Sequence, residues 1–144
     1  MTAKSTDLTN AQSIAPSTDA IAQLIANYFA AIRALDDSEY LNALTEDVVN
    51  HDPVGVKTTQ GKSAMAESFT AMKGLFAQLE IYETFVAIAP NGEVAVKWSA
   101  TGHTHGGKTT KFEGIDLFVI DATPKIQEIR AYWEPQTMLA QIKS

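Results

Sequence analysis

The strongest constraint on the fold is a change in the spacing of apolar residues near residue 77 of the 144-residue chain. Before this point, apolar side chains recur every three or four residues, as they do along one face of a helix. After it, apolar and polar side chains alternate, which is typical of strands. Helices followed by a run of antiparallel strands form an α+β pattern. We therefore expect a curved antiparallel sheet wrapped over a long helix.

Three helices are predicted in the first half. The first begins near residue 18, capped by Ser17, Thr18 or Asp19, because these side chains accept hydrogen bonds from free helical amides. Its apolar stripe comprises Ile21, Leu24, Ile25, Tyr28, Phe29 and Ile32. The second spans 36–47 with Asp36 or Asp37 as its cap. The third spans 61–76 and is marked by the spacing of Met65, Phe69, Met72 and Phe76.

Between the second and third helices, residues 48–61 are predicted to form a brief extended piece and a loop, because Pro53, Gly55 and Gly61 interrupt the pattern. The second half predicts four strands, at 79–89, 92–105, 108–120 and 125–135. Turns of the hairpin type are expected at "PNG" and "GG", and "DATPK" links the last two strands.

Composition places this fold in one domain. Residues 1–17 are rich in Ser, Thr and Ala without a sustained period, which predicts a flexible N-terminal tail. Residues 18–144 are predicted to form a single domain, of a size that allows a real hydrophobic core.

Charge and cysteine content exclude several classes of function. The formal net charge is -6, which disfavours nucleic acid and anionic membrane as partners. Without cysteine there is no disulfide framework, thiolate nucleophile or cysteine-ligated metal. No apolar run is long enough to span a bilayer and no signal peptide is visible, so we expect a soluble cytoplasmic protein.

An acid in the middle of an apolar strand is the most unusual local feature. In "FEGIDLFVID", alternation puts Asp116 on one face with Phe112, Gly114 and Phe118, and both faces are largely apolar. Burial raises a carboxyl pKa, so a buried Asp116 would be protonated and able to donate a hydrogen bond. The alternative is an edge or bent strand on which Asp116 reaches water or a lysine.

Two further residues are candidates for chemistry. In "NHDPVG", the proline after Asp52 favours an extended backbone and removes an amide donor, which suits a proton acceptor. The alternative is that Asp52 simply starts a turn. Tyr28 lies on the apolar stripe, where its hydroxyl needs a partner: a backbone carbonyl or a ligand in a pocket.

A metal site is not predicted. His103 and His105 in "GHTHGG" are expected to share one strand face beside a hairpin tip, with only His51 elsewhere in the chain. Exposed polar residues are normal at such a tip, and two imidazoles are too few for a complete ligand set.

These motifs together resemble bacterial ketosteroid isomerases within the nuclear-transport-factor-2-like superfamily, whose fold is a cone-shaped (cystatin-like) α+β structure. "LIANYFAAIRALD" is similar to the family's first helix, "VVNHDPVG" to its catalytic loop, "GIDLFVID" to its oxyanion-hole strand and "IRAYWEP" to its last strand. The resemblance extends from residue 18 to about 137. "ATGHTHGGKTTKFEGIDLF" also resembles SnoaL-like polyketide cyclases.

The resemblance implies roles for particular residues. Asp52 would remove a proton next to a carbonyl and return it to a more distant carbon, while Tyr28 and a neutral Asp116 would donate hydrogen bonds to the enolate oxygen. Substrate contacts would come from Trp133, Phe69 and Phe118. Phe69 stands where some relatives carry a tyrosine that supports the oxyanion-hole tyrosine.

The resemblance further implies an isomerase acting on a small hydrophobic, steroid-like substrate without metal or organic cofactor, and a homodimer formed through the outer face of the sheet. Because this superfamily uses one fold for many purposes, two alternatives stay open. One is a polyketide cyclase or dehydratase using the same acids, and the other is a non-catalytic small-molecule-binding or dimerisation domain.

Overall fold

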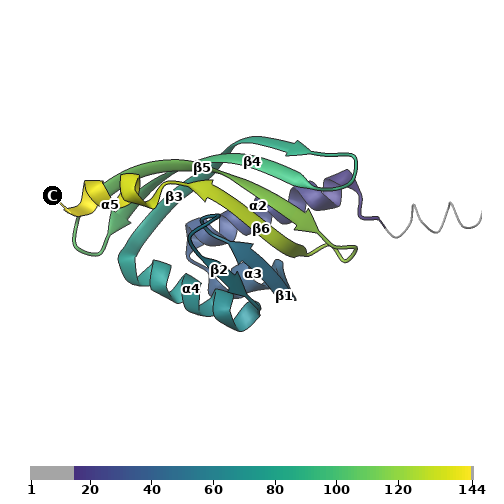
Figure 1. Ribbon diagram of the computed structural model, residues 1–144, viewed down its shortest axis with the longest axis horizontal. Helices are drawn as coiled ribbons and strands as arrows, with labels where there is room; N and C mark the ends of the chain where they lie inside the picture. The colour runs from purple at the N-terminus through teal and green to yellow at the C-terminus, as the bar shows by residue number, and fades with distance from the viewer. Residues whose placement is uncertain (1–14, 144) are drawn as a thin grey trace, which may run out of the picture.

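The computed structural model describes residues 15–143, and Figure 1 shows their helices and strands. Residues 1–14 of the predicted N-terminal tail lie outside the described residues. The elements are, in chain order, α2 (Thr18–Ala34), α3 (Asp37–Asn42), β1 (Leu44–His51), β2 (Thr58–Gln60), α4 (Lys62–Leu75), β3 (Phe76–Ile88), β4 (Val94–Thr104), β5 (Thr109–Ile120), β6 (Ile126–Trp133) and α5 (Pro135–Lys143).

The six described strands form a single sheet in the order β2-β1-β6-β5-β4-β3. Helices α2, α3 and α4 gather against one side of the long curved strands, and α5 lies at one end of the sheet (Figure 1). This arrangement confirms the predicted α+β cone. It leaves one face of the sheet turned toward the helices and the other turned away from them.

Two of the three predicted helix starts follow from side-chain capping. Ser17 caps α2, where its hydroxyl accepts a hydrogen bond from the Ala20 amide at 3.1 Å. Asp36 caps α3 in the same way, accepting from the Glu39 amide at 3.1 Å. Each bond satisfies an amide that has no partner inside its helix, which is why these residue types mark helix starts.

The predicted meander of four strands is confirmed as β3 to β6, each pair antiparallel. Gly92 and Gly107 both have positive φ angles, of 88° and 87°, in the turns before β4 and β5. Glycine adopts such angles without strain from a side chain, so "PNG" and "GG" could mark these turns in the sequence.

The prediction for residues 36–47 is wrong in its second half. Helix α3 ends at Asn42, and Leu44 begins the eight-residue strand β1. Strand β1 pairs with β6 in parallel, with Asn50 opposite Ile129, so the sheet is not purely antiparallel. The pairing joins segments about 80 residues apart, and a local sequence pattern carries no information about such a contact.

A fourth helix was not predicted. Pro135 ends the alternation of β6 and is the first residue of α5, a position where its fixed φ and missing amide are tolerated. Gln141 then ties α5 to β5, because its side chain accepts from the Lys111 amide and donates to the Lys111 carbonyl, both at 2.7 Å. Among residues 15–143, no helix combines the length and hydropathy needed to cross a membrane.

Close packing around Gly114 predicts a large effect of a single methyl group. A Cβ atom added there would lie 2.5 Å from Trp98 Cζ2 and 2.8 Å from both Trp133 Cβ and the Tyr132 carbonyl oxygen. We expect Gly114→Ala to lower the free energy of unfolding by roughly 1–3 kcal/mol, because backbone and two indoles must shift. Urea denaturation measures the change.

The matched control is Gly74→Ala in α4, where a Cβ atom meets nothing within 4 Å. Alanine favours a helix over glycine, so we expect this variant to gain stability, by up to about 1 kcal/mol. Equal stabilities for the two variants would contradict the packing described at Gly114.

Candidate active site

A cavity of about 290 Å³ lies between the three helices and the inner face of the sheet. Five of the six residues proposed from the sequence line it: Tyr28, Asp52, Phe69, Asp116 and Trp133. Most of the remaining lining is hydrocarbon and aromatic, from α2, α4 and the long strands. A few polar groups in an apolar hollow are the usual make-up of a small-molecule site.

Asp116 is held on the buried face of an interior strand. Strand β5 lies between β4 and β6, and its alternating burial turns Asp116 inward, with only 6% of its surface exposed. The alternative of an edge strand is therefore excluded. Across the hairpin, Trp98 on β4 faces Gly114, whose missing side chain leaves room for the indole to reach the carboxyl group.

The Trp98 indole N–H donates a hydrogen bond of 2.9 Å to Asp116 Oδ1. Burial raises the pKa of Asp116 to about 7, because it disfavours the charged form. The bond from Trp98 acts in the opposite direction, and the nearby charge of Asp52 adds to the rise. A large share of Asp116 is thus protonated at neutral pH and can donate a hydrogen bond.

Tyr28 projects from α2 into the same cavity and is itself buried. Its ring packs edge-on against Phe29 and Phe118, with centroids 5.3 and 5.4 Å away. Burial, followed by the influence of Tyr40 and Asp116, raises the pKa of Tyr28 well above its ordinary value of 10. The phenol therefore keeps its proton and remains a hydrogen-bond donor.

Tyr40 in α3 is a site residue that the sequence analysis missed. Its ring packs against that of Tyr28, with centroids 5.5 Å apart, and stacks on Phe69 with centroids 4.3 Å apart. Phe69 carries no hydroxyl, whereas Tyr40 brings one to the cavity from another element. An aromatic residue in a short and mostly polar segment, "DSEYLN", is the signal that could have found it.

Asp52 follows β1 at the mouth of the cavity, where it both lines the cavity and is exposed to solvent. The Trp133 indole N–H donates a hydrogen bond of 2.6 Å to Asp52 Oδ1, and the Asp52 amide donates to the Lys57 carbonyl at 2.9 Å. Within residues 15–143, Asp52 Oδ2 has no hydrogen-bonding partner. This oxygen is free to accept a proton.

Phe118, proposed as a substrate contact, does not line the cavity. It is 1% exposed and lies behind Tyr28, so its ring supports the tyrosine rather than a ligand. Conversely, Asn50 on β1 lines the cavity and was missed, because an asparagine next to a predicted loop is unremarkable in sequence. Its side-chain Oδ1 is buried without a partner among the described residues, which costs about 1–3 kcal/mol.

The two histidines considered for a metal site are separately engaged. His103 Nε2 lies 2.7 Å from Glu80 Oε1, and His105 Nε2 lies 2.8 Å from the Lys73 carbonyl oxygen. The prediction that they share a strand face is wrong, because β4 ends at Thr104. Across residues 15–143, no group of three or more His, Cys, Asp or Glu side chains is placed to hold a metal ion.

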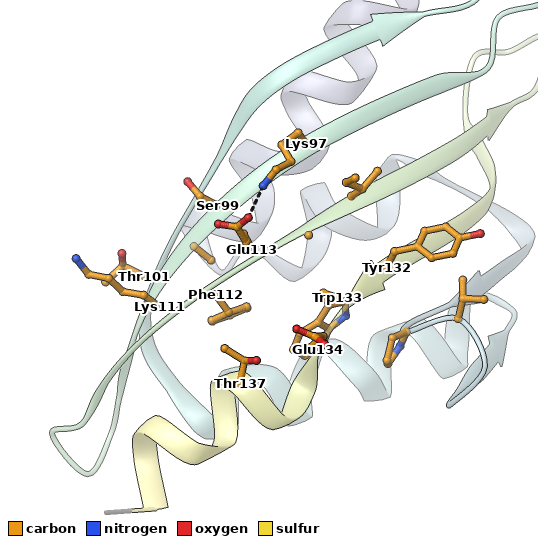
Figure 2. A pocket seen from close by; sticks show the side chains of 15 residues that line it. Lys97, Ser99, Thr101, Lys111, Phe112, Glu113, Tyr132, Trp133, Glu134 and Thr137 are labelled. Carbon is orange, nitrogen blue, oxygen red and sulfur yellow. Dashed lines mark hydrogen bonds and ion pairs between the residues drawn. The ribbon is translucent and has the colours of Figure 1, made fainter.

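A second, larger hollow of about 960 Å³ opens on the face of the sheet turned away from α2, α3 and α4. Figure 2 shows Lys97 and Glu113 joined across it, at 2.8 Å, with Tyr132 on the neighbouring strand and Thr137 on α5. Trp133 lines both this hollow and the inner cavity.

Comparison with known proteins finds related sequences and folds. A family model described as SnoaL-like domain matches residues 25–134. Steroid Delta-isomerase of Nocardioides simplex is 26% identical over 115 residues, covering 80% of this chain and 90% of that protein.

Solved structures share the fold. The epoxide hydrolase/cyclase-like enzyme SalBIII, which has a role in pyran ring formation in the polyether salinomycin, is 22% identical with a TM-score of 0.74, covering 83% of this chain and 94% of that one. RV0760c from Mycobacterium tuberculosis, solved with estradiol-17beta-hemisuccinate, is 20% identical with a TM-score of 0.72, covering 79% and 93%.

The raised pKa of Asp116 predicts a pH-dependent stability. Since its folded pKa of about 7 exceeds the ordinary value of 3.8, the folded protein keeps a proton that the unfolded chain releases between these values. The free energy of unfolding should therefore fall as pH rises from about 4 to 7. We expect Asp116→Asn to lose this part of the slope in urea denaturation at several pH values.

Asp47→Asn is the control, because it removes an exposed carboxylate from the same sheet and should retain the slope. If the parent and Asp116→Asn have parallel stability profiles over this range, the carboxyl group is not protonated by burial.

Proposed function

The chain belongs to the SnoaL-like domain family, and from this premise we propose that it is an isomerase-like enzyme that moves a proton alpha to a carbonyl group. The substrate is a small hydrophobic, steroid-like ketone, and the intermediate is an enolate. The observation that carries the proposal is the convergence of Tyr28, Asp52 and Asp116 on one largely apolar cavity.

Asp52 is the proposed base. Its free Oδ2 takes a proton from the carbon next to the substrate carbonyl, and the C–H electron pair becomes the enolate double bond. The proton then returns from Asp52 to the more distant carbon, which completes the isomerisation without net gain or loss of atoms. Trp133, bonded to Oδ1, positions the carboxylate for both transfers.

Tyr28 and protonated Asp116 are the proposed donors to the carbonyl oxygen, where negative charge develops. Because both groups are buried, their hydrogen bonds strengthen as the charge appears and need little reorganisation. Trp98 occupies Asp116 Oδ1, so the carboxyl group has its other oxygen available for the ligand. Tyr40 positions Tyr28 through the packing of their rings, whose centroids are 5.5 Å apart.

Two relatives support a hydrophobic ligand. One is a steroid Delta-isomerase, and the other was solved with a steroid hemisuccinate. The aromatic lining of the cavity, with Phe69, Phe112 and Trp133, suits flat hydrocarbon rings.

A cyclase or dehydratase is the second candidate. It would use the same base and donors on a different carbon skeleton. The fold shared with the epoxide hydrolase/cyclase-like enzyme SalBIII supports this second candidate. A purely non-catalytic binding domain would not need an aspartate with a free oxygen on the same cavity as a buried phenol and a partly protonated acid, which argues against that alternative.

We also propose that the protein is a homodimer, as the family resemblance implies. Ile115, Leu117 and Tyr132 form an exposed apolar patch on the outer face of the sheet, with exposed fractions of 44%, 38% and 43%. Ile115 and Tyr132 are neighbours across β5 and β6, so the patch is continuous there. Such patches favour association. The cytoplasmic location expected from the sequence stays a prediction.

The proposed isomerase activity is tested with a β,γ-unsaturated ketosteroid, whose isomerisation produces absorbance from a conjugated enone. We expect turnover by the parent protein and a loss of roughly a hundred- to ten-thousand-fold in kcat/KM for Asp52→Asn, because the amide cannot accept the proton.

Asp47→Asn, which alters an exposed carboxylate of β1, should retain the parent rate. No absorbance change above buffer with the parent protein would reject this substrate class, and full activity in Asp52→Asn would remove Asp52 from the role of base.

The proposed dimer is tested by sedimentation velocity. Leu117→Lys places a charge in the outer patch, and we expect it to shift the protein from dimer to monomer because a buried unpaired lysine is costly. Val56→Lys is the control, since Val56 is 75% exposed in the loop before β2. A monomeric parent protein, or a Leu117→Lys variant that remains dimeric, would contradict the interface.

A further inference from the structure

Asn50 is a buried polar residue that the proposed proton transfer does not use. It is 5% exposed and points inward from β1, as Val48 does two residues earlier, and it lines the same cavity as Asp52. Its Oδ1 atom is buried and has no hydrogen-bonding partner among residues 15–143. Buried amide groups are nearly always paired, so a buried amide without a partner beside a cavity points to a ligand.

The neighbouring groups do not compensate for this unpaired amide. The backbone of Asn50 is engaged in the sheet, opposite Thr59 on β2 and Ile129 on β6. His51, the next residue, points outward, where its ring lies 3.1 Å from Thr58 Oγ1. The Asn50 side chain is left, and it lines the cavity while its Oδ1 atom is covered without a hydrogen-bonding partner among the described residues.

A second polar side chain lies directly across the strands. Thr59 is buried, pairs with Asn50 in the β1–β2 register and also lines the cavity. Together they form a polar corner, made of an amide that can donate and accept and a hydroxyl that can do both. In a cavity built to hold only a hydrocarbon skeleton, apolar side chains would be more stable at these positions.

We propose that Asn50 and Thr59 form a subsite that binds a second oxygen of the substrate, a hydroxyl or carbonyl group remote from the reacting carbonyl. This inference rests on the proposed function, because it assumes that the cavity binds the reacting ketone. It narrows the substrate class to hydrophobic ketones that carry a further oxygen on their skeleton, near the side of the cavity where Asp52 lies.

Binding of phenolic probes tests the subsite. The oxygen of β-naphthol is a planar analogue of an enolate oxygen, and dihydroxynaphthalene isomers add a second hydroxyl at different positions. We expect at least one isomer to bind the parent protein about tenfold more tightly than β-naphthol, the effect of one well-made hydrogen bond. In Asn50→Leu, we expect that isomer and β-naphthol to bind with nearly equal affinity. Calorimetry measures both affinities.

Thr45→Val is the matched control, because Thr45 Oγ1 is also buried without a partner among the described residues but Thr45 does not line the cavity. It should retain the parent's preference. A parent protein that prefers none of the isomers, or a preference that survives in Asn50→Leu, would overturn the subsite. If Asn50 only held a water molecule, Asn50→Leu would change the affinities for β-naphthol and for the preferred dihydroxynaphthalene equally. That result would also overturn the subsite.

Stability separates a ligand-binding role from a structural one. Because Asn50 has no partner to lose, Asn50→Leu should leave the thermal midpoint unchanged or raise it, whereas a structural asparagine would lower it on replacement. A lowered midpoint would contradict the proposal. The naphthol measurements report binding alone, and the ketosteroid assay reports turnover. The subsite can therefore be rejected while the isomerase activity is found, and the activity can be rejected while the subsite is found.

Discussion

Asp116 lies in surroundings that disfavour its charge, and the indole of Trp98 restores part of the stability of the charged form. The balance of these two effects sets how much of the acid is neutral near pH 7. Trp98 can reach Asp116 only because the residue opposite it on β5 is Gly114. The chemistry of the cavity thus depends on a glycine that itself carries no functional group.

Much of the fold was predictable because its determinants are local. Capping side chains, glycine turns and the alternation of β3 to β6 act within a few residues, and they placed Asp116 on a buried face correctly. The parallel pairing of β1 with β6 could not be predicted, since it joins residues distant in sequence. Helix α5 was missed because Pro135 signals the end of a strand as well as the start of a helix.

In the candidate site, too, the residues with a local sequence signal were predictable and the others were not. Tyr28, Asp52 and Asp116 stand out because each is polar in an apolar or proline-marked context, and the family resemblance linked them. Tyr40 and Trp98 do not stand out, because what distinguishes them is a contact across the fold with Tyr28 and Asp116. Asn50 does not stand out either, because only the fold shows that it is buried beside the cavity. Tyr40 shows this best, because its place in the cavity depends on how α3 packs against Tyr28 and Phe69.

The pairing of each cavity carboxyl group with an indole has an optical consequence. The chain contains two tryptophans, Trp98 and Trp133, and they donate to Asp116 and Asp52 respectively. Their ring centroids are 6.4 Å apart, close enough for exchange of excitation energy. The tryptophan emission of the protein therefore comes from the two indoles that are hydrogen-bonded to these acids, so it should respond to any molecule that binds between them.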